Sequence, residues 1–180
     1  MTTINLIKTF LITAIISLSW PYVSNADYTS EEFQRSYFDI GYKEVNAALQ
    51  ESRDHFKKDI ALPVQIPSIE FTHSFGRFNN LDGDMNDGFE IEYLHINKPR
   101  NHYMIRVKPV KYGLPIMQEH IDQTFKLKDG SKAFYSTKIA RGFNLLVFQK
   151  NGWQYVLNID KGVSDLVTTD NLVEIADSIR

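Results

Sequence analysis

From Ser68 onward the sequence alternates apolar and polar residues, and this period of two constrains the fold more than any other feature. Successive side chains of a β-strand point to opposite faces, so each alternating run can bury one face and leave the other in water. Asn151-Gly152, between two such runs, is a strong signal for a tight hairpin. The runs are 68–75 (SIEFTHSF), 89–96 (FEIEYLHI), 102–110 (HYMIRVKPV), 133–140 (AFYSTKIA), 143–150 (FNLLVFQK) and 153–160 (WQYVLNID). They predict a meandering antiparallel sheet of about six strands.

Helical patterns stand on both sides of these runs. Thr29 and Glu32 have the spacing of a capping box, which predicts a helix start there. Gly41 is expected to break this region, and a second helix should end near Phe56, before two prolines. A last helix is predicted over residues 170–179, capped by Thr168 or Thr169, with four apolar side chains facing the core: Leu172, Ile175, Ala176 and Ile179. The fold class is therefore α+β, with N-terminal helices, the sheet and a C-terminal helix.

The first 26 residues have the features of a secretory leader. Lys8 precedes a short apolar run, and Ser24 and Ala26 supply the small side chains that signal peptidase accepts, which predicts cleavage after Ala26. The apolar run is shorter than the roughly 20 residues that a membrane span requires. We therefore expect a signal peptide over 1–26 and one α+β domain over 27–180, of which 27–42 form an N-terminal helical extension. An uncleaved signal anchor, which would tie the protein to a membrane, is the alternative to secretion.

Composition narrows the function classes. The 180 residues contain no cysteine, which excludes disulfides, cysteine zinc sites, thiol nucleophiles and a lipid anchor on an N-terminal cysteine. A secreted chain without disulfides fits a bacterial envelope better than a eukaryotic secretory route. The formal net charge of −2 offers no basic excess for nucleic acid, so we expect no nucleic-acid partner.

Residues 81–93 (LDGDMNDGFEIEY) raise the question of a calcium loop. Asp82, Asp84 and Asn86 occupy the first, third and fifth positions of an EF-hand-type loop. The sixth position is Asp87 instead of glycine, and the twelfth is Tyr93 instead of glutamate. The competing interpretation is a polar turn, whose Asp, Asn and Gly residues tolerate left-handed backbone geometry.

Two histidines raise a similar question about zinc. His95 and His102 flank the turn at residues 96–101 and are expected to face each other across the hairpin, with Glu92 or His73 nearby. Two imidazoles and a carboxylate are suitable zinc ligands. The competing interpretation is that His95 ends an apolar row and is satisfied by backbone or water.

The sequence offers few signals of catalysis. It contains no G-x-S-x-G elbow, no S-x-x-K pair and no glycine-rich phosphate loop. Glu90 and Glu92 form a carboxylate pair, but we expect them on the solvent face of a strand, paired with Arg106 or Lys108 across the hairpin. No catalytic residue and no cofactor is assigned.

The C-terminal third resembles a domain family. Residues 132–179 contain a hairpin pattern L-x-F-x-x-x-G-x-x-Y-x-L and a final helix L-x-x-I-A-x-S-I, and upstream IALPVQIPSIEF is similar to the family's entry strand. In this chain the pattern residues are Leu146, Phe148, Gly152, Tyr155, Leu157, Leu172, Ile175, Ala176, Ser178 and Ile179. The family is a domain of unknown function on the extracytoplasmic side of Gram-positive, spore-forming bacteria. The likeness covers residues 43–179 and carries no assigned active site, and it does not account for residues 31–42 or the insertion 78–88 (FNNLDGDMNDG).

Two functions follow as hypotheses. The first is a secreted or envelope-associated, non-catalytic domain that binds a protein, a cell-wall component or a hydrophobic ligand on its sheet. A contiguous exposed apolar surface or a deep apolar pocket on the sheet would support it. The second is a small secreted metal-dependent hydrolase, which requires the histidines or the aspartate loop to converge in one cleft.

Overall fold

The structure is a computed structural model that describes residues 28–180, so the leader predicted over 1–26 and its cleavage at Ala26 lie outside the described residues. Within this part of the chain three α-helices occur: α1 (Ser30–Asp39), α2 (Val45–Phe56) and α3 (Thr169–Asp177). The predicted capping box is confirmed, because the Thr29 hydroxyl accepts from the Glu32 amide at 3.2 Å. Thr168 caps α3 in the same way. The α+β class is confirmed, with helices before and after the strands in the chain.

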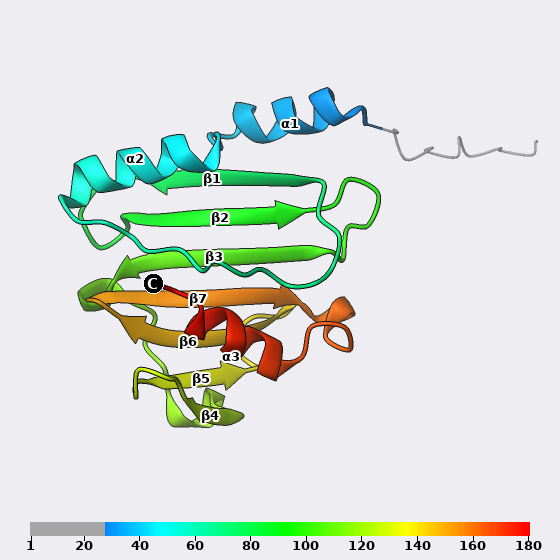
Figure 1. The fold of residues 1–180 in the computed structure, drawn as a ribbon. Coiled ribbons are helices and arrows are strands. Elements are labelled where there is room, and N and C mark those ends of the chain that lie inside the picture. The colour runs from blue at the N-terminus through cyan, green and yellow to red at the C-terminus, as the bar shows by residue number, and fades with distance from the viewer. Residues whose placement is uncertain (1–27) are drawn as a thin grey trace, which may run out of the picture.

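In residues 28–180 all strands join one seven-stranded antiparallel sheet of order β1-β2-β3-β7-β6-β5-β4, shown face-on in Figure 1. The strands are β1 (His73–Asn79), β2 (Gly88–Leu94), β3 (His102–Pro109), β4 (Gln123–Lys126), β5 (Lys132–Ser136), β6 (Phe143–Lys150) and β7 (Trp153–Asp160). Three short 3-10 turns are η1 (Val110–Tyr112), η2 (Gln118–His120) and η3 (Lys161–Val163). The hairpin predicted at Asn151-Gly152 joins β6 to β7, and both residues have the positive φ that this turn requires.

Two predicted strand ranges were wrong: β5 ends at Ser136 instead of continuing to residue 140, and the first strand starts late. The first strand begins at His73, not at Ser68, because residues 57–72 cross one face of the sheet before joining it (Figure 1). The Trp153 indole and the Tyr155 hydroxyl hold this crossing segment by donating to the carbonyls of Asp59 and Ala61, each at 2.9 Å. Aromatic side chains of β7 therefore satisfy backbone groups that would otherwise be buried without partners.

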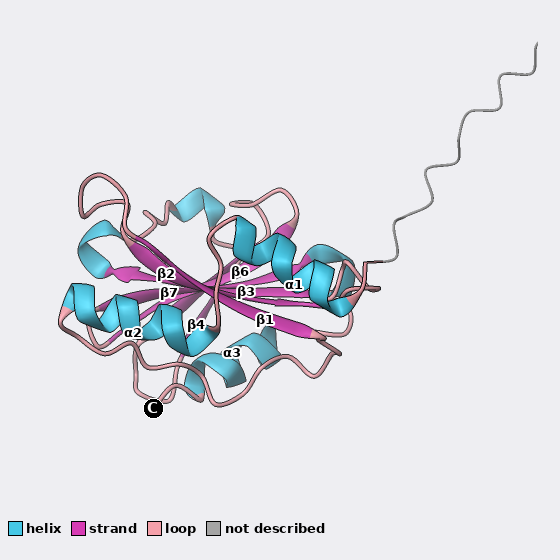
Figure 2. Cartoon of the chain, turned by 90° about the horizontal axis from the view of Figure 1, so that it is seen from above, coloured by secondary structure: helices cyan, strands magenta, loops and turns pink. Residues whose placement is uncertain are grey.

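The main core lies between one face of the sheet and the helices α2 and α3. Figure 2 shows these two helices on the same side of the strands. The alternate side chains of the central strands that point to this side are fully buried: Phe89, Ile91, Tyr103, Ile105, Val107, Tyr155, Leu157 and Ile159. The four residues predicted to face the core from the last helix are all buried in the same cluster.

The opposite face of the sheet is covered by smaller elements. At the β1 edge α1 packs Phe33 and Tyr37 against a cluster that includes Phe75, whose ring stacks on Tyr37 with centroids 4.5 Å apart. Towards the other edge, the connection from β3 to β4 crosses the sheet, and we call its residues 113–117 the strap and this side the strap face. None of the helices in residues 28–180 has the length and apolar character needed to cross a membrane.

Helix α2 approaches β1 at Gly76 so closely that only glycine fits. A Cβ atom added to Gly76 would lie 2.8 Å from the Val45 Cα atom and 2.9 Å from the Ala48 Cβ atom. Gly76 also exchanges two backbone hydrogen bonds with Lys43, at 2.8 and 2.9 Å, just before α2 begins. The helix is thus fixed to the edge strand by backbone contacts.

We therefore expect Gly76→Ala to lower the free energy of unfolding by about 1–3 kcal/mol, because the added methyl overpacks this contact. Urea unfolding measures the change. Gly142→Ala is the matched control, since nothing lies within 4 Å of its added Cβ and we expect a change within about 0.5 kcal/mol. Equal losses in the two variants would contradict the close approach of α2.

Candidate functional site

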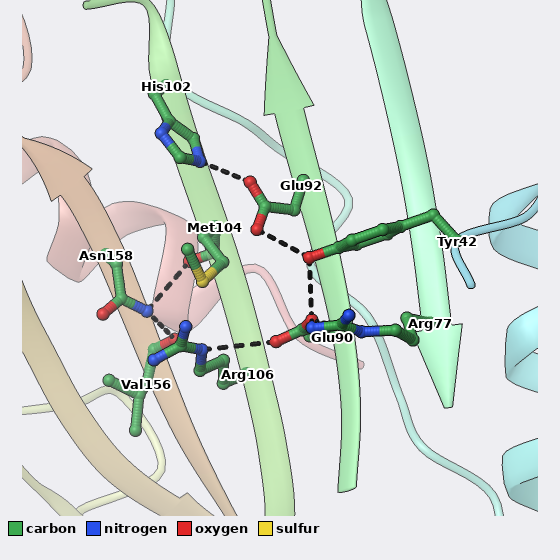
Figure 3. Close-up of polar contacts among 9 residues, drawn as sticks. All are labelled: Tyr42, Arg77, Glu90, Glu92, His102, Met104, Arg106, Val156 and Asn158. Atoms are coloured by element: carbon green, nitrogen blue, oxygen red, sulfur yellow. Dashed lines mark hydrogen bonds and ion pairs between the residues drawn. The ribbon is translucent and has the colours of Figure 1, made fainter. Parts of the chain in front are cut away.

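Two buried glutamates stand side by side on the strap face. Glu90 and Glu92 of β2 are 5% and 7% exposed, so the prediction that they face solvent was wrong. Burying a carboxylate destabilises the folded state unless the carboxylate is paired and hydrogen-bonded, so the surrounding side chains must supply those partners. Figure 3 shows the group that does so. We call it the carboxylate network, and its members are Tyr42, Arg77, Glu90, Glu92, His102 and Arg106.

Glu90 is held mainly by two arginines from the neighbouring strands. The register places Arg77 of β1 and Arg106 of β3 opposite Glu90 on either side. Arg77 donates from Nε at 2.8 Å, while Arg106 Nε lies 3.4 Å from the other carboxylate oxygen. The predicted pairing of Glu90 with Arg106 is therefore confirmed, and Arg77 is the stronger partner. Its guanidinium also lies over the Tyr42 ring, 4.3 Å from the centroid, as a cation–π contact.

The Tyr42 hydroxyl bridges the two glutamates. It lies 2.9 Å from an oxygen of Glu90 and 2.9 Å from an oxygen of Glu92, and both contacts are buried (Figure 3). Burial raises the pKa of Tyr42 well above its usual value, and the two carboxylates raise it further. Tyr42 therefore remains a neutral hydroxyl, and its single proton donates to one of the two carboxylates at a time.

Glu92 contacts a histidine as well as the tyrosine. A ring nitrogen of His102 lies within hydrogen-bonding distance of the free oxygen of Glu92 (Figure 3). Burial alone would raise the pKa of Glu92, but the contacts with His102 and Tyr42 outweigh it and hold that pKa below its ordinary value. Glu92 is thus an anion fixed by its neighbours, not a free general base.

A pocket of about 660 Å³ adjoins the network on the strap face. Leu145 and Val156, from β6 and β7, form an apolar floor, and the strap and the β5–β6 connection add apolar walls at Leu114 and Ile139. Arg106, Lys108 and Lys111 line the same pocket, as do Met85 and Asn86 from the loop before β2. The pocket therefore combines an apolar floor with basic side chains on one side.

The strap is fixed over the sheet by one side chain. The Gln154 amide accepts from the Leu114 amide at 2.5 Å and donates to the Leu114 carbonyl at 2.9 Å, which imitates a strand pairing. A second pocket of about 630 Å³ lies on the other side of the strap, and Gln154 lines both. The strap thus divides the strap face into two pockets.

The loop that raised the question of calcium forms two turns beside this pocket. Asp82 and Asp84 are exposed, while the Asn86 side chain donates to the Asp82 carbonyl at 3.3 Å. Asp87 points inward instead: it is 2% exposed, accepts from the Leu81 amide at 3.0 Å and contacts His55 at 2.8 Å. The loop is a polar turn secured by a buried aspartate, and calcium binding by Asp82, Asp84 and Asn86 stays a prediction.

The two histidines proposed for zinc have separate partners. The register sets His102 opposite Leu94, one residue from the expected pairing with His95. His95 accepts from the Asn97 amide at 3.1 Å and lies 3.8 Å from Glu70, whereas His102 contacts Glu92. Strand register thus gives the two imidazoles different carboxylates. Throughout residues 28–180, no three histidine, aspartate or glutamate side chains are grouped as a metal site requires.

Several members of the site were not singled out from the sequence: Tyr42, Arg77, Gln154 and Asn158. A signal for Arg77 existed, since the alternation of the first strand continues past Phe75 and places Arg77 on the face of Glu90. Asn158 is buried and donates from its amide to the carbonyls of Met104 and Val156 at 3.3 and 3.0 Å (Figure 3). No pattern in the sequence around Tyr42 indicates that its side chain contacts Glu90 and Glu92.

Comparisons of the chain with protein-family models, curated proteins and solved structures gave no match. The geometry of the strap face is therefore the basis for a functional proposal.

The lowered pKa of Glu92 predicts a pH dependence of stability. Its contribution is fully present above the ordinary value of 4.5 and is lost as the pH falls through the lower pKa of the folded state. We expect Glu92→Gln to lower the free energy of unfolding by about 1–3 kcal/mol at neutral pH, because the charged hydrogen bonds are lost. The deficit relative to the unmodified protein should shrink as the pH is lowered through this range.

Urea unfolding at a series of pH values measures this difference. Glu119→Gln is the control, because Glu119 is exposed, and its profile should run parallel to that of the unmodified protein. A deficit for Glu92→Gln that stays constant with pH would contradict the assignment of a paired, ionised Glu92.

Proposed function

We propose that the chain is a secreted or envelope-associated, non-catalytic domain that binds a small hydrophobic ligand in the pocket of the strap face. One observation carries the proposal: a pocket of about 660 Å³ with an apolar floor at Leu145 and Val156. Ligand pockets are typically about 300–1,000 Å³ and mainly apolar, with a few polar groups that orient the ligand. A small molecule suits a pocket walled by the strap and by Ile139 better than a protein surface does.

The arrangement of titratable groups favours binding over catalysis. Glu90 and Glu92 are engaged by Arg77, His102 and Tyr42, so their charges are bound to protein groups. A general base must instead reach a proton of the substrate. A metal-dependent hydrolase finds less support, because His95 and His102 have different partners.

Location outside the cytoplasm rests on sequence. The leader pattern before residue 27 and the resemblance over residues 43–179 favour the extracytoplasmic side of a bacterium. For a secreted chain, the absence of cysteine fits a bacterial envelope better than a eukaryotic secretory route. The two segments that the resemblance does not cover, 31–42 and 78–88, supply Tyr42 to the network and Met85 to the pocket wall. We therefore propose that these segments adapt the common fold to this chain's own ligand.

The test uses a neutral apolar fluorescent probe, N-phenyl-1-naphthylamine, titrated against residues 27–180. We expect saturable binding to one site, because the probe is small and apolar enough for the pocket. Ala140→Phe should weaken binding about tenfold or more, since the larger ring occupies the pocket wall.

Ala140→Ser is the matched control, because it keeps the size of the side chain, and its affinity should equal that of the unmodified protein. Urea unfolding of each variant checks that the fold is retained. Absence of saturable binding, or equal affinity in the Ala140→Phe variant, would show that the pocket is not the ligand site.

A further inference from the structure

The lining of the pocket carries more positive charge than the binding of an uncharged apolar ligand requires. Arg106 and Lys108 project from β3, and Lys111 follows in η1. Among the described residues that line this pocket, none is an aspartate or glutamate. A lining with three basic side chains and no acidic one favours a negatively charged ligand.

The basic groups are only partly neutralised by the rest of the protein. Arg106 is the weaker of the two arginine partners of Glu90, at 3.4 Å, and its side chain is 55% exposed. Lys108 donates to the carbonyl of Met85 at 3.3 Å, and a carbonyl carries no net charge. Lys111 lies over the Tyr112 ring, 4.5 Å from its centroid. The contact with Tyr112 raises the pKa of Lys111, and the charge of exposed Asp84 in the neighbouring loop raises it further.

The charged and apolar parts of the pocket are next to each other. Arg106 and Val156 are Cα partners across the β3–β7 ladder and both line the pocket, so the Arg106 side chain leaves the sheet directly beside the apolar floor. Leu145 continues that floor on β6, opposite Asn158 of β7. A ligand that fills both regions must carry its charge at one end and an apolar part at the other.

We infer that the ligand of this pocket is a small amphiphilic anion, an aliphatic carboxylate free in solution, whose charged end meets Arg106, Lys108 and Lys111 and whose chain covers Leu145 and Val156. An arginine fork matches the two oxygens of a carboxylate. The walls that the strap and Ile139 add around the floor favour a single molecule in solution over the flat surface of a bilayer. This inference rests on the proposed function, since it names the ligand class of the same pocket.

The test compares three ligands with the same ten-carbon chain: decanoate, 1-decanol and decylammonium. Each is titrated against residues 27–180 by isothermal titration calorimetry, below the concentration at which it forms micelles or separates from solution. We expect decanoate to bind about tenfold or more tightly than 1-decanol, because charge-assisted hydrogen bonds are added to the same apolar contact. Decylammonium should bind most weakly, and added salt should weaken decanoate selectively.

Variants locate the effect in the pocket. Arg106→Gln and Lys111→Gln should each weaken decanoate binding several-fold and leave 1-decanol binding unchanged. Lys111 lies in an exposed turn, so its variant keeps the test valid if Arg106→Gln disturbs the network. Lys128→Gln, an exposed lysine outside the pocket lining, is the control and should bind decanoate with unchanged affinity.

The outcomes separate the two proposals. Equal affinity for decanoate and 1-decanol would overturn the anionic ligand and leave the apolar pocket as the binding site. Tighter binding of decylammonium, or co-sedimentation with phosphatidylglycerol vesicles without binding of decanoate, would also overturn it. Failure of the neutral probe and of all three ligands to bind would overturn both the inference and the proposed function.

Discussion

The buried carboxylates of Glu90 and Glu92 are the constraint on which the strap face depends. Two anions taken out of water destabilise a fold by several kcal/mol each unless partners surround them. The partners come from three places: Tyr42 from the link between α1 and α2, Arg77 from β1, and His102 with Arg106 from β3. These side chains restrain one another through their shared contacts. The carboxylate network is therefore a fixed polar centre between the two edges of the strap face.

This polar centre positions the proposed ligand site. Arg106 belongs to the network and to the pocket, so the pairing that limits its motion also holds it beside the apolar floor. Gln154 fixes the strap on the other side of that floor through two hydrogen bonds to Leu114. A preorganised site loses less conformational entropy when a ligand binds, so these restraints favour recognition.

Signals local in sequence predicted most of the fold. The capping residues Thr29 and Thr168 and the turn at Asn151-Gly152 act through neighbours within a few positions, and each is where the pattern indicated. The site was less predictable because its parts are distant. Glu90 looked solvent-facing because alternation says which face a residue takes, not what covers that face, and Tyr42 lies 48 positions before it. His95 and His102 are not directly opposite each other, because the register depends on the geometry of the loop between their strands, which the sequence does not specify.

Ligand binding on the strap face should leave the α2/α3 face unchanged. Amide hydrogen–deuterium exchange of residues 27–180, with and without saturating decanoate, measures this for each segment of the domain. We predict slower exchange in residues 83–87 and 110–116 and around Ala140, the segments that border the pocket, with unchanged exchange in α2 and α3. Protection confined to α2, α3 or the crossing segment 57–72 would place the ligand on the opposite face and contradict this account.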